Sequence, residues 1–319
     1  MGRTAGHATH GALVEPLPHG AGPRHGHEAV TARERAAAYF ALTKPRIIEL
    51  LLITTVPPMI VAADGWPSLW LILATLTGGA LSAGGANAIN CYVDRDIDQV
   101  MARTRKRPLP SHKVAPRNAL VFGVALGVAA FVFLYLTVNP ISAVLATAAL
   151  LFYVFVYTIG LKRSTPQNIV IGGAAGAMPA LVGWSAVTGR VDLPALALFA
   201  IVFYWTPPHF WALAMRYEKE YAAAGVPMMP VVYGRAETAK HILLYSLLLF
   251  AICLVFFAVG RMGMIYLAAA LALNSVFVAL AVRLWRRPER DVAWSLFRYS
   301  IYYLALLFGA VAADRLIAF

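Results

Sequence analysis

Four oxygen-bearing side chains recur at helical spacing in the first third of the chain, and their types suit metal chemistry. Asn87, Asn90, Asp94 and Asp98 are separated by three, four and four positions, so a continuous helix places them on one face. Carboxylates one turn apart repel each other when they have no partner, so this face is expected to hold a cation. Because the donors are oxygens, without Cys or His, the pattern favours Mg²⁺ over zinc or copper.

The alternative interpretation of these residues is a solvated helix end beside a basic loop, which the spacing alone leaves open. Their location favours function. The preceding stretch, residues 69 to 88, carries no charge and is long enough to cross a bilayer as a helix. The acidic stripe therefore lies where that helix leaves the membrane. Ionisable residues at a membrane edge are costly and are usually retained for function.

The composition is that of a polytopic membrane protein. Of 319 residues, 60% are hydrophobic and 13% are charged, whereas soluble domains carry about 25% charged residues. We expect a disordered cytoplasmic tail over residues 1–38, followed by an all-α membrane domain over residues 39–319. Apolar segments predict nine transmembrane helices, at residues 47–63, 69–91, 118–137, 141–160, 167–187, 193–215, 238–260, 263–283 and 296–314.

The distribution of positive charge predicts the orientation of this bundle. All but three of the 27 lysines and arginines fall on the side that holds the N-terminus, and the exceptions are Arg190, Arg261 and Arg315. Positive loops mark the cytoplasmic side, so we expect the N-terminus inside, the C-terminus outside and the acidic stripe facing the cytoplasm. The same clustering accounts for the net charge of +12 without nucleic acid as a partner. No organelle signal is apparent, which favours a bacterial inner membrane.

A second polar constellation follows the sixth predicted span. Pro207 and Pro208 interrupt that helix and free backbone carbonyls, which a membrane tolerates only where protein or a watery cavity satisfies them, so a central cavity is expected here. Glu218 and Glu220 offer a second set of oxygens, and Arg216 offers donors for the anionic oxygens of a substrate. The alternative is that Arg216 and Glu220 form only a surface pair.

Lys162 and Arg163 form a third polar feature, five and six residues after Tyr157. Two cations at the end of a span are commonly no more than positive-inside anchors. Two acidic clusters and several cations on one side of a membrane are nevertheless typical of a diphosphate site. Carboxylates bind Mg²⁺, and Mg²⁺ together with Lys and Arg neutralises a diphosphate leaving group as its bond breaks.

These motifs resemble a known family. Asn90-x3-Asp94-x3-Asp98 resembles the first aspartate-rich motif of the UbiA superfamily of intramembrane prenyltransferases. Closer matches, to the protohaem IX farnesyltransferase branch of that superfamily, are carried by the segments Leu42-Thr-Lys-Pro-Arg46, Met101-x-Arg-Thr-x-x-Arg-Pro108, Tyr157-Thr-x-x-Leu-Lys-Arg163, Trp205-Thr-Pro-Pro-His-Phe-Trp-Ala-Leu213 and Ala224-Gly-Val-Pro-Met-Met-Pro230.

The resemblance implies a UbiA-type bundle and a reaction. Farnesyl diphosphate ionises, a vinyl group of haem b captures the allylic cation, and water completes the substituent of haem O. Asn90, Asp94 and Asp98 would bind the diphosphate through Mg²⁺, with Lys162 and Arg163 as cationic partners. The farnesyl chain needs a dry chamber, because water would quench the cation. Besides the two substrates and the lipid bilayer, haem A synthase and cytochrome oxidase assembly factors are candidate partners.

Further site residues are expected from the same resemblance. His209 is the candidate contact for haem, although a His beside two prolines is more often a structural donor to freed carbonyls. Glu218 and Glu220 stand where relatives carry a second aspartate-rich motif, and they are candidate metal ligands. The remaining candidates for ligand binding are Asn87, Tyr157, Arg216, Lys44 and Arg46.

Three other functions stay open at this stage. One is prenylation of an aromatic or quinone precursor, which competition by haem or by hydroxybenzoate would separate from haem farnesylation. Another is transport, which places charges near the bilayer midplane, whereas this chain gathers its polar residues at one face. The last is a haem-handling protein that binds without turnover, which an Asp94→Asn variant would distinguish from an enzyme.

Overall fold

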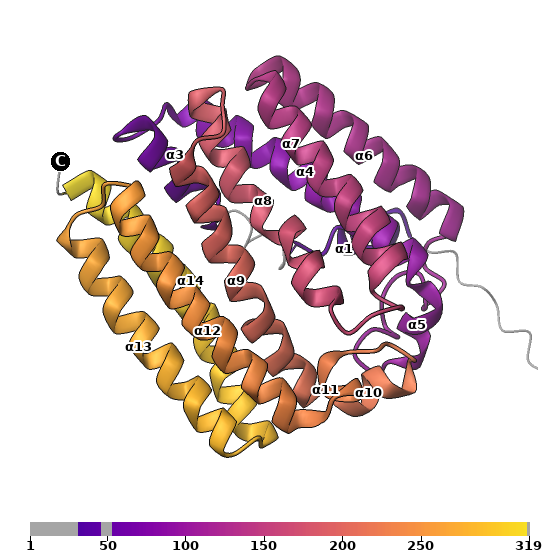
Figure 1. Ribbon diagram of the computed structural model, residues 1–319. Coiled ribbons are helices and arrows are strands. Elements are labelled where there is room, and N and C mark those ends of the chain that lie inside the picture. Colours follow the sequence, from indigo (N-terminus) through magenta and orange to yellow (C-terminus); the bar gives the residue numbers. More distant parts are fainter. Residues whose placement is uncertain (1–30, 46–52, 318–319) are drawn as a thin grey trace, which may run out of the picture.

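The protein is a bundle of long helices (Figure 1), and the computed structural model describes residues 31–45 and 53–317. Eight helices in this part are long and apolar enough to cross a membrane, which confirms the predicted all-α polytopic fold. They are α4 (Leu69–Val93), α6 (Pro116–Thr137), α7 (Pro140–Leu151) continued by η1 (Phe152–Leu161), α8 (Asn168–Thr188), α9 (Leu193–Arg216), α12 (Gly234–Val259), α13 (Met264–Arg286) and α14 (Arg290–Ile317).

The N-terminal part of the bundle differs in detail from the prediction. The first of the nine expected spans, residues 47–63, contains α3 (Val56–Ala63), and its residues 47–52 lie outside the described residues. Helix α1 (Ala32–Leu42) overlaps the expected tail, so residues 32–38 are helical, while residues 1–30 lie outside the described residues. The helix begins there because Thr31 and Glu34 form a capping box, in which each side chain accepts a hydrogen bond from the other's backbone N–H.

Small residues allow the helices to approach closely where the site is built. Helix α4 packs along α6, and a Cβ atom on Gly85 would lie 2.7 Å from the carbonyl oxygen of Gly123. A side chain at this position would separate the two backbones. In a bilayer, where lipid is as apolar as leucine, such close van der Waals packing is a main source of helix association. The close approach of α6 therefore supports the helix that carries the acidic stripe.

Helices α9, α12, α13 and α14 form the tightly packed half of the bundle. Large side chains between them, including Trp211, Phe256 and Tyr303, are fully buried. Several polar groups inside this half bond to one another, as groups shielded from water must. The Tyr303 hydroxyl donates to Asn274 Oδ1 at 2.9 Å, and the Tyr266 hydroxyl donates to the Cys253 carbonyl at 2.9 Å. From this half, α9 and Leu304 of α14 reach the wall of the cavity described below.

Three short helices gather at one end of the bundle: α5 (Arg95–Val100), α10 (Glu218–Ala223) and α11 (Met229–Val232) (Figure 1). Helix α5 follows α4 and continues the acidic stripe. Helices α10 and α11 follow α9, and α10 carries Glu218 and Glu220 of the second polar constellation. A different polar cluster joins α14 to the segment after α3, where Arg315 donates to Asp64 at 2.8 Å and to the Gly260 carbonyl at 2.7 Å. The fold thus brings the two predicted constellations to the same end.

Candidate active site

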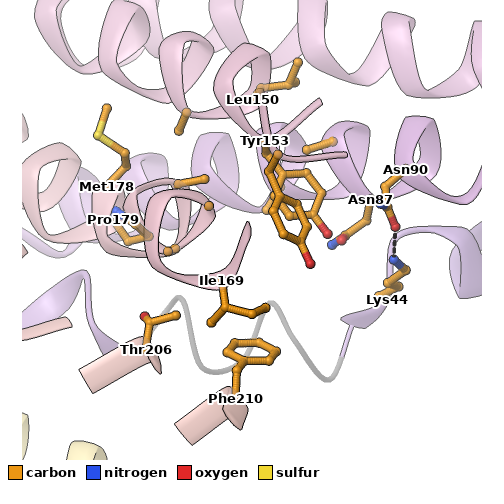
Figure 2. A pocket seen from close by; sticks show the side chains of 18 of the residues that line it. Lys44, Asn87, Asn90, Leu150, Tyr153, Ile169, Met178, Pro179, Thr206 and Phe210 are labelled. Carbon is orange, nitrogen blue, oxygen red and sulfur yellow. Dashed lines mark hydrogen bonds between the residues drawn. The ribbon is translucent and has the colours of Figure 1, made fainter. Parts of the chain in front are cut away.

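A cavity of about 360 Å³ opens among α4, η1, α8 and α9 (Figure 2). Its wall is apolar over much of its extent and includes Leu76, Ile169, Met178, Val202 and Phe210. Polar side chains are contributed chiefly by α4 and α5, by the segments that follow α1 and α5, and by the residue that follows η1. They are Lys44, Asn87, Asn90, Asp98, Arg103, Thr104, Arg107 and Lys162. The cavity therefore has the amphiphilic lining predicted for it.

The acidic stripe lies on one helical face, as its spacing predicted. Helix α4 ends at Val93 and α5 begins at Arg95, yet the backbone hydrogen-bond register continues through the break. The Asp94 N–H donates to the Asn90 carbonyl and the Asp98 N–H donates to the Asp94 carbonyl, each at 2.9 Å. Asn90, Asp94 and Asp98 are buried, with no more than 2% of any of them exposed. The predicted alternative of a solvated acidic surface is therefore wrong.

Basic side chains from distant parts of the chain neutralise the buried acids. Lys162 forms an ion pair with Asp94, and the Arg107 guanidinium donates to both carboxylate oxygens of Asp98, at 2.9 and 2.8 Å. Asn90 connects this set, because its Oδ1 accepts from Lys44 Nζ at 2.6 Å and its Nδ2 donates to Asp94 at 2.8 Å (Figure 2). Carboxylates that would repel each other are thereby compensated in a dry environment.

The segment that carries Lys162 is wound as a π-helix, which the sequence did not predict. In η1 the Lys162 N–H donates to the Tyr157 carbonyl five residues earlier, at 2.8 Å. Thr158 uses the wider turn in the same way: its hydroxyl donates to the Tyr153 carbonyl at 2.8 Å and accepts from Asn90 Nδ2 at 3.1 Å. π-Helical turns are rare and occur frequently at functional sites. Here the turn joins Lys162 and Thr158 to the acidic stripe.

Tyr153 and Tyr157 lie on the same π-helical segment and line the cavity. Their ring centroids are 5.3 Å apart. Tyr157 was predicted as a ligand-binding residue, and it reaches the cavity together with Asn87, whose amide donates to the Thr43 carbonyl at 3.0 Å. The two phenol rings add aromatic surface to the cavity wall.

Two charged groups at this end have shifted pKa values. Arg163 donates to both oxygens of the exposed Asp96, at 2.6 and 2.7 Å, and these hydrogen bonds lower the pKa of Asp96 to about 2. Burial lowers the pKa of Lys44 to about 8, because the protein interior disfavours its charged form. Arg163 also lies 3.8 Å from Asp94, so it extends the cationic edge of the site.

His209 does not line the cavity, contrary to its predicted role as a haem contact. Its Nδ1 lies 2.7 Å from Ser300 Oγ on α14, and its ring stacks on Trp205 with centroids 4.3 Å apart. Its neighbours Thr206 and Phe210 face the cavity instead. The structure thus places His209 in the contact between α9 and α14, a structural position in which its partner is the Ser300 hydroxyl and not a freed carbonyl.

The second set of acids is not brought together with the first. Glu218 pairs with Arg235 at 2.7 Å, and Glu220 accepts from the Arg103 N–H at 3.5 Å. Arg216 lies over the Trp294 ring, 3.5 Å from Asp291, and it is not part of the cavity wall. Arg46 lies outside the described residues. In the ranges that the structure covers, no group of three His, Cys, Asp or Glu side chains is arranged to hold a metal ion.

Site residues that the predictions omitted come from the segment after α5. Arg107 and Thr104 both line the cavity, and Thr104 donates to the Asp98 carbonyl at 2.9 Å. They belong to the segment Met101-x-Arg-Thr-x-x-Arg-Pro108, so the resemblance marked them. No local spacing rule pairs Arg107 with Asp98, because the chain must turn back between them.

One observation fits a hard cation at the acidic stripe. Asp94 Oδ1 is buried and has no hydrogen-bond partner among the described residues, although Arg163 lies nearby. Asn90 and Asp98 on the same helical face offer further amide and carboxylate oxygens, the ligand type that Mg²⁺ prefers, although Lys44 and Arg107 occupy them here. A buried oxygen without a partner is costly, and a bound cation removes that cost.

The fold and site define a polytopic helical membrane protein whose apolar chamber has a buried, oxygen-rich and cation-edged end. Comparison with known proteins identifies the family to which the chain belongs. The UbiA prenyltransferase family matches residues 51–307, so the chain belongs to this family. Its membership agrees with an enzyme rather than with a transporter.

Two relatives are both named protoheme IX farnesyltransferase. The protein of Parafrankia sp. (strain EAN1pec) is 55% identical over 289 residues, covering 90% of this chain and 92% of its own length. A protein of Saccharopolyspora erythraea is 56% identical over 281 residues, covering 87% of this chain and 89% of its own length.

Solved structures share the fold at low sequence identity. A digeranylgeranylglyceryl phosphate synthase aligns with a TM-score of 0.75 at 18% identity, over 88% of this chain and 99% of its own. A UbiA homolog from Archaeoglobus fulgidus, bound to DMAPP and Mg²⁺, aligns with a TM-score of 0.59 at 16% identity, over 86% of this chain and 99% of its own. These similarities establish the fold and say nothing of the acceptor.

Proposed function

We propose that this chain transfers the farnesyl group of farnesyl diphosphate to a vinyl group of haem b, giving haem O and diphosphate. The observation that carries the proposal is a polar end of a largely apolar cavity, lined by Asn90, Asp98 and Lys162, where Lys162 pairs with the buried Asp94. Relatives at 55–56% identity, named for this reaction and matched over most of their length, support the choice of acceptor.

The reaction begins when the bond between C1 of the farnesyl chain and the diphosphate oxygen breaks, and the electron pair leaves with the diphosphate. Lys162 and Arg163 stabilise the charge that develops on the leaving group, since both already lie against Asp94. The allylic cation then bonds to the terminal carbon of the vinyl group. Water adds to the resulting cation beside the porphyrin and releases a proton.

The apolar wall excludes water during the first of these steps. Ile169, Val202 and Phe210 line the chamber in which the farnesyl chain would lie, away from the acidic stripe. A cation formed in bulk water would be quenched before it met the acceptor, so this exclusion is required by the chemistry. Tyr153 and Tyr157 add aromatic faces that attract a cation.

Asn90, Asp94 and Asp98 are the residues that would hold Mg²⁺. When bound, the metal neutralises the diphosphate and so assists its departure. A UbiA homolog of the same fold has been solved with DMAPP and Mg²⁺, which supports a divalent metal in the family. Among the described residues, Glu218 and Glu220 share no hydrogen-bond or ion-pair partner with the acidic stripe, so the proposal does not include them in the metal set.

The charge distribution supports a cytoplasmic position for this site in a bacterial inner membrane. Lysine and arginine cluster on the side of the chain that includes Lys162 and Arg107, so we expect the N-terminus inside and the C-terminus outside. Farnesyl diphosphate and haem b are both amphiphiles, and both can enter an intramembrane cavity from the lipid. Their charged groups then lie near the basic edge.

Extraction of haem from membranes that contain the chain tests the proposed reaction. With haem b, farnesyl diphosphate and Mg²⁺ supplied, we expect chromatography to show haem O, and removal of divalent metal with a chelator to abolish it. Membranes without the chain are the control. Recovery of haem b alone would contradict the proposal, as would prenylation of hydroxybenzoate in preference to haem.

A further inference from the structure

One cation in the cavity wall is held differently from the others. Among residues 31–45 and 53–317, four basic side chains line the cavity. Lys44 donates to Asn90, while Arg107 and Lys162 pair with buried aspartates. The Arg103 guanidinium forms no ion pair with any carboxylate of the described residues.

Aromatic rings from the start of α10 hold the Arg103 side chain in place. Its guanidinium carbon lies 5.1 Å from the ring centroid of Tyr217 and 5.8 Å from that of Tyr221. Its Nη2 donates to the Tyr221 hydroxyl at 3.1 Å, and its backbone N–H is 3.5 Å from Glu220 Oε2. Cation–π contacts orient a guanidinium without cancelling its charge. Two aromatic rings therefore orient Arg103 in the cavity wall, where its guanidinium has no carboxylate partner among the described residues.

This arrangement suits an anionic oxygen brought by a ligand. A guanidinium has five N–H donors in a planar fork that matches a carboxylate, and within the part of the chain that the structure describes a single hydrogen bond uses them. Lys162 and Arg163, which face the acidic stripe, lie on the chain after η1. Arg103 instead packs against Tyr217 and Tyr221 and, among the described residues, pairs with none of the acids of the stripe. Its guanidinium is therefore available to a second anionic group besides the diphosphate.

We propose that Arg103 binds a propionate carboxylate of the haem acceptor and thereby sets its orientation over the farnesyl chain. This inference rests on the proposed function, since it assigns the two anionic substrates to different cations. A phosphate oxygen of farnesyl diphosphate offers similar chemistry. An experiment can distinguish a propionate from a diphosphate as the anion that Arg103 binds. Esterification of haem removes the charge of the propionates and leaves the diphosphate unchanged.

The test is equilibrium binding of haem b and of its dimethyl ester, followed by absorbance in detergent without farnesyl diphosphate. We expect the wild-type chain to bind haem b about 10- to 100-fold more tightly than the ester, the range of a hydrogen bond to a charged group. Arg103→Gln should lose this preference, and Arg103→Lys should keep part of it. The KM for farnesyl diphosphate should stay within twofold of the wild-type value in both variants.

Arg105→Gln is the matched control, because Arg105 is exposed in the same segment and does not line the cavity. It should keep the preference for haem b over the ester. If Arg103→Gln keeps that preference while its KM for farnesyl diphosphate rises tenfold, the arginine serves the diphosphate and the assignment to a propionate is overturned. If Arg103→Gln changes neither the preference for haem b over its ester nor the KM for farnesyl diphosphate, Arg103 binds neither substrate and the proposal is overturned. Because haem binding needs no turnover, a wild-type chain that fails to form haem O leaves this measurement interpretable.

Discussion

Asp94→Asn is the substitution that most directly tests the site. Asp94 is fully buried and its partner Lys162 is only 16% exposed at the side chain. Asparagine keeps the shape of the residue and removes its charge, which leaves the Lys162 ammonium without its carboxylate in a poorly solvated place. Breaking a buried ion pair in this way costs about 3–5 kcal/mol of stability. We also expect turnover to fall by about 10²–10³-fold, the effect of losing one electrostatic contact to the reacting groups.

Loss of folding and loss of chemistry must be separated in this experiment. The double variant Asp94→Asn with Lys162→Met removes both charges, so its melting temperature in detergent should recover most of what the single variant loses. Its production of haem O should stay low, because the groups that bind diphosphate are gone. The two measurements together distinguish an unfolded variant from an inactive one.

Asp96→Asn is the matched control for Asp94→Asn. Asp96 also pairs with Arg163, but its side chain is 61% exposed. An exposed pair contributes about 0–1 kcal/mol, so this variant should keep near-wild-type turnover and melting temperature. The reasoning would be refuted if Asp94→Asn retained turnover within threefold of the wild-type rate, or if Asp96→Asn lost as much activity as Asp94→Asn.

Two further predictions concern the pH dependence and the farnesyl chamber. Since burial lowers the pKa of Lys44 to about 8, its charge is present below that pH and is lost above it, so turnover should fall as the pH rises through about 8. Lys44→Arg, which stays protonated, should remove this alkaline limb, and a limb that persists would exclude Lys44 as its cause. Gly176 lines the cavity, and no atom lies within 4 Å of a Cβ built there. In Gly176→Leu the leucine side chain should therefore extend into the cavity and shorten it. The rate with farnesyl diphosphate should fall about tenfold or more relative to the rate with geranyl diphosphate. Gly309→Leu, at an exposed position with equal room, should leave the ratio of the two rates unchanged.

Features that depend on near neighbours in the chain were predictable from the sequence. The apolar spans match the helices because length and hydropathy are local properties, and the stripe from Asn87 to Asp98 lies on one face because its spacing follows the helical period. The charges at the span ends indicated the polar end of the cavity. The expected interruption of the helix by Pro207 and Pro208 was wrong, because α9 continues through both prolines and neither lines the cavity. Family resemblance marked Arg107 and Lys162 without indicating which acid each would meet.

Pairings between distant segments were decided by the tertiary structure. Lys162 meets Asp94 across 68 positions of sequence because η1 is wound as a π-helix and packs against α4. His209 faces Ser300 rather than the cavity, and Glu218 pairs with Arg235, because the rotation of α9 and the path of the chain after it place them there. A sequence specifies which charges must be compensated at this membrane edge. Only the packing of whole helices, through contacts as close as that of Gly85 with Gly123, selects the partner that compensates each of them.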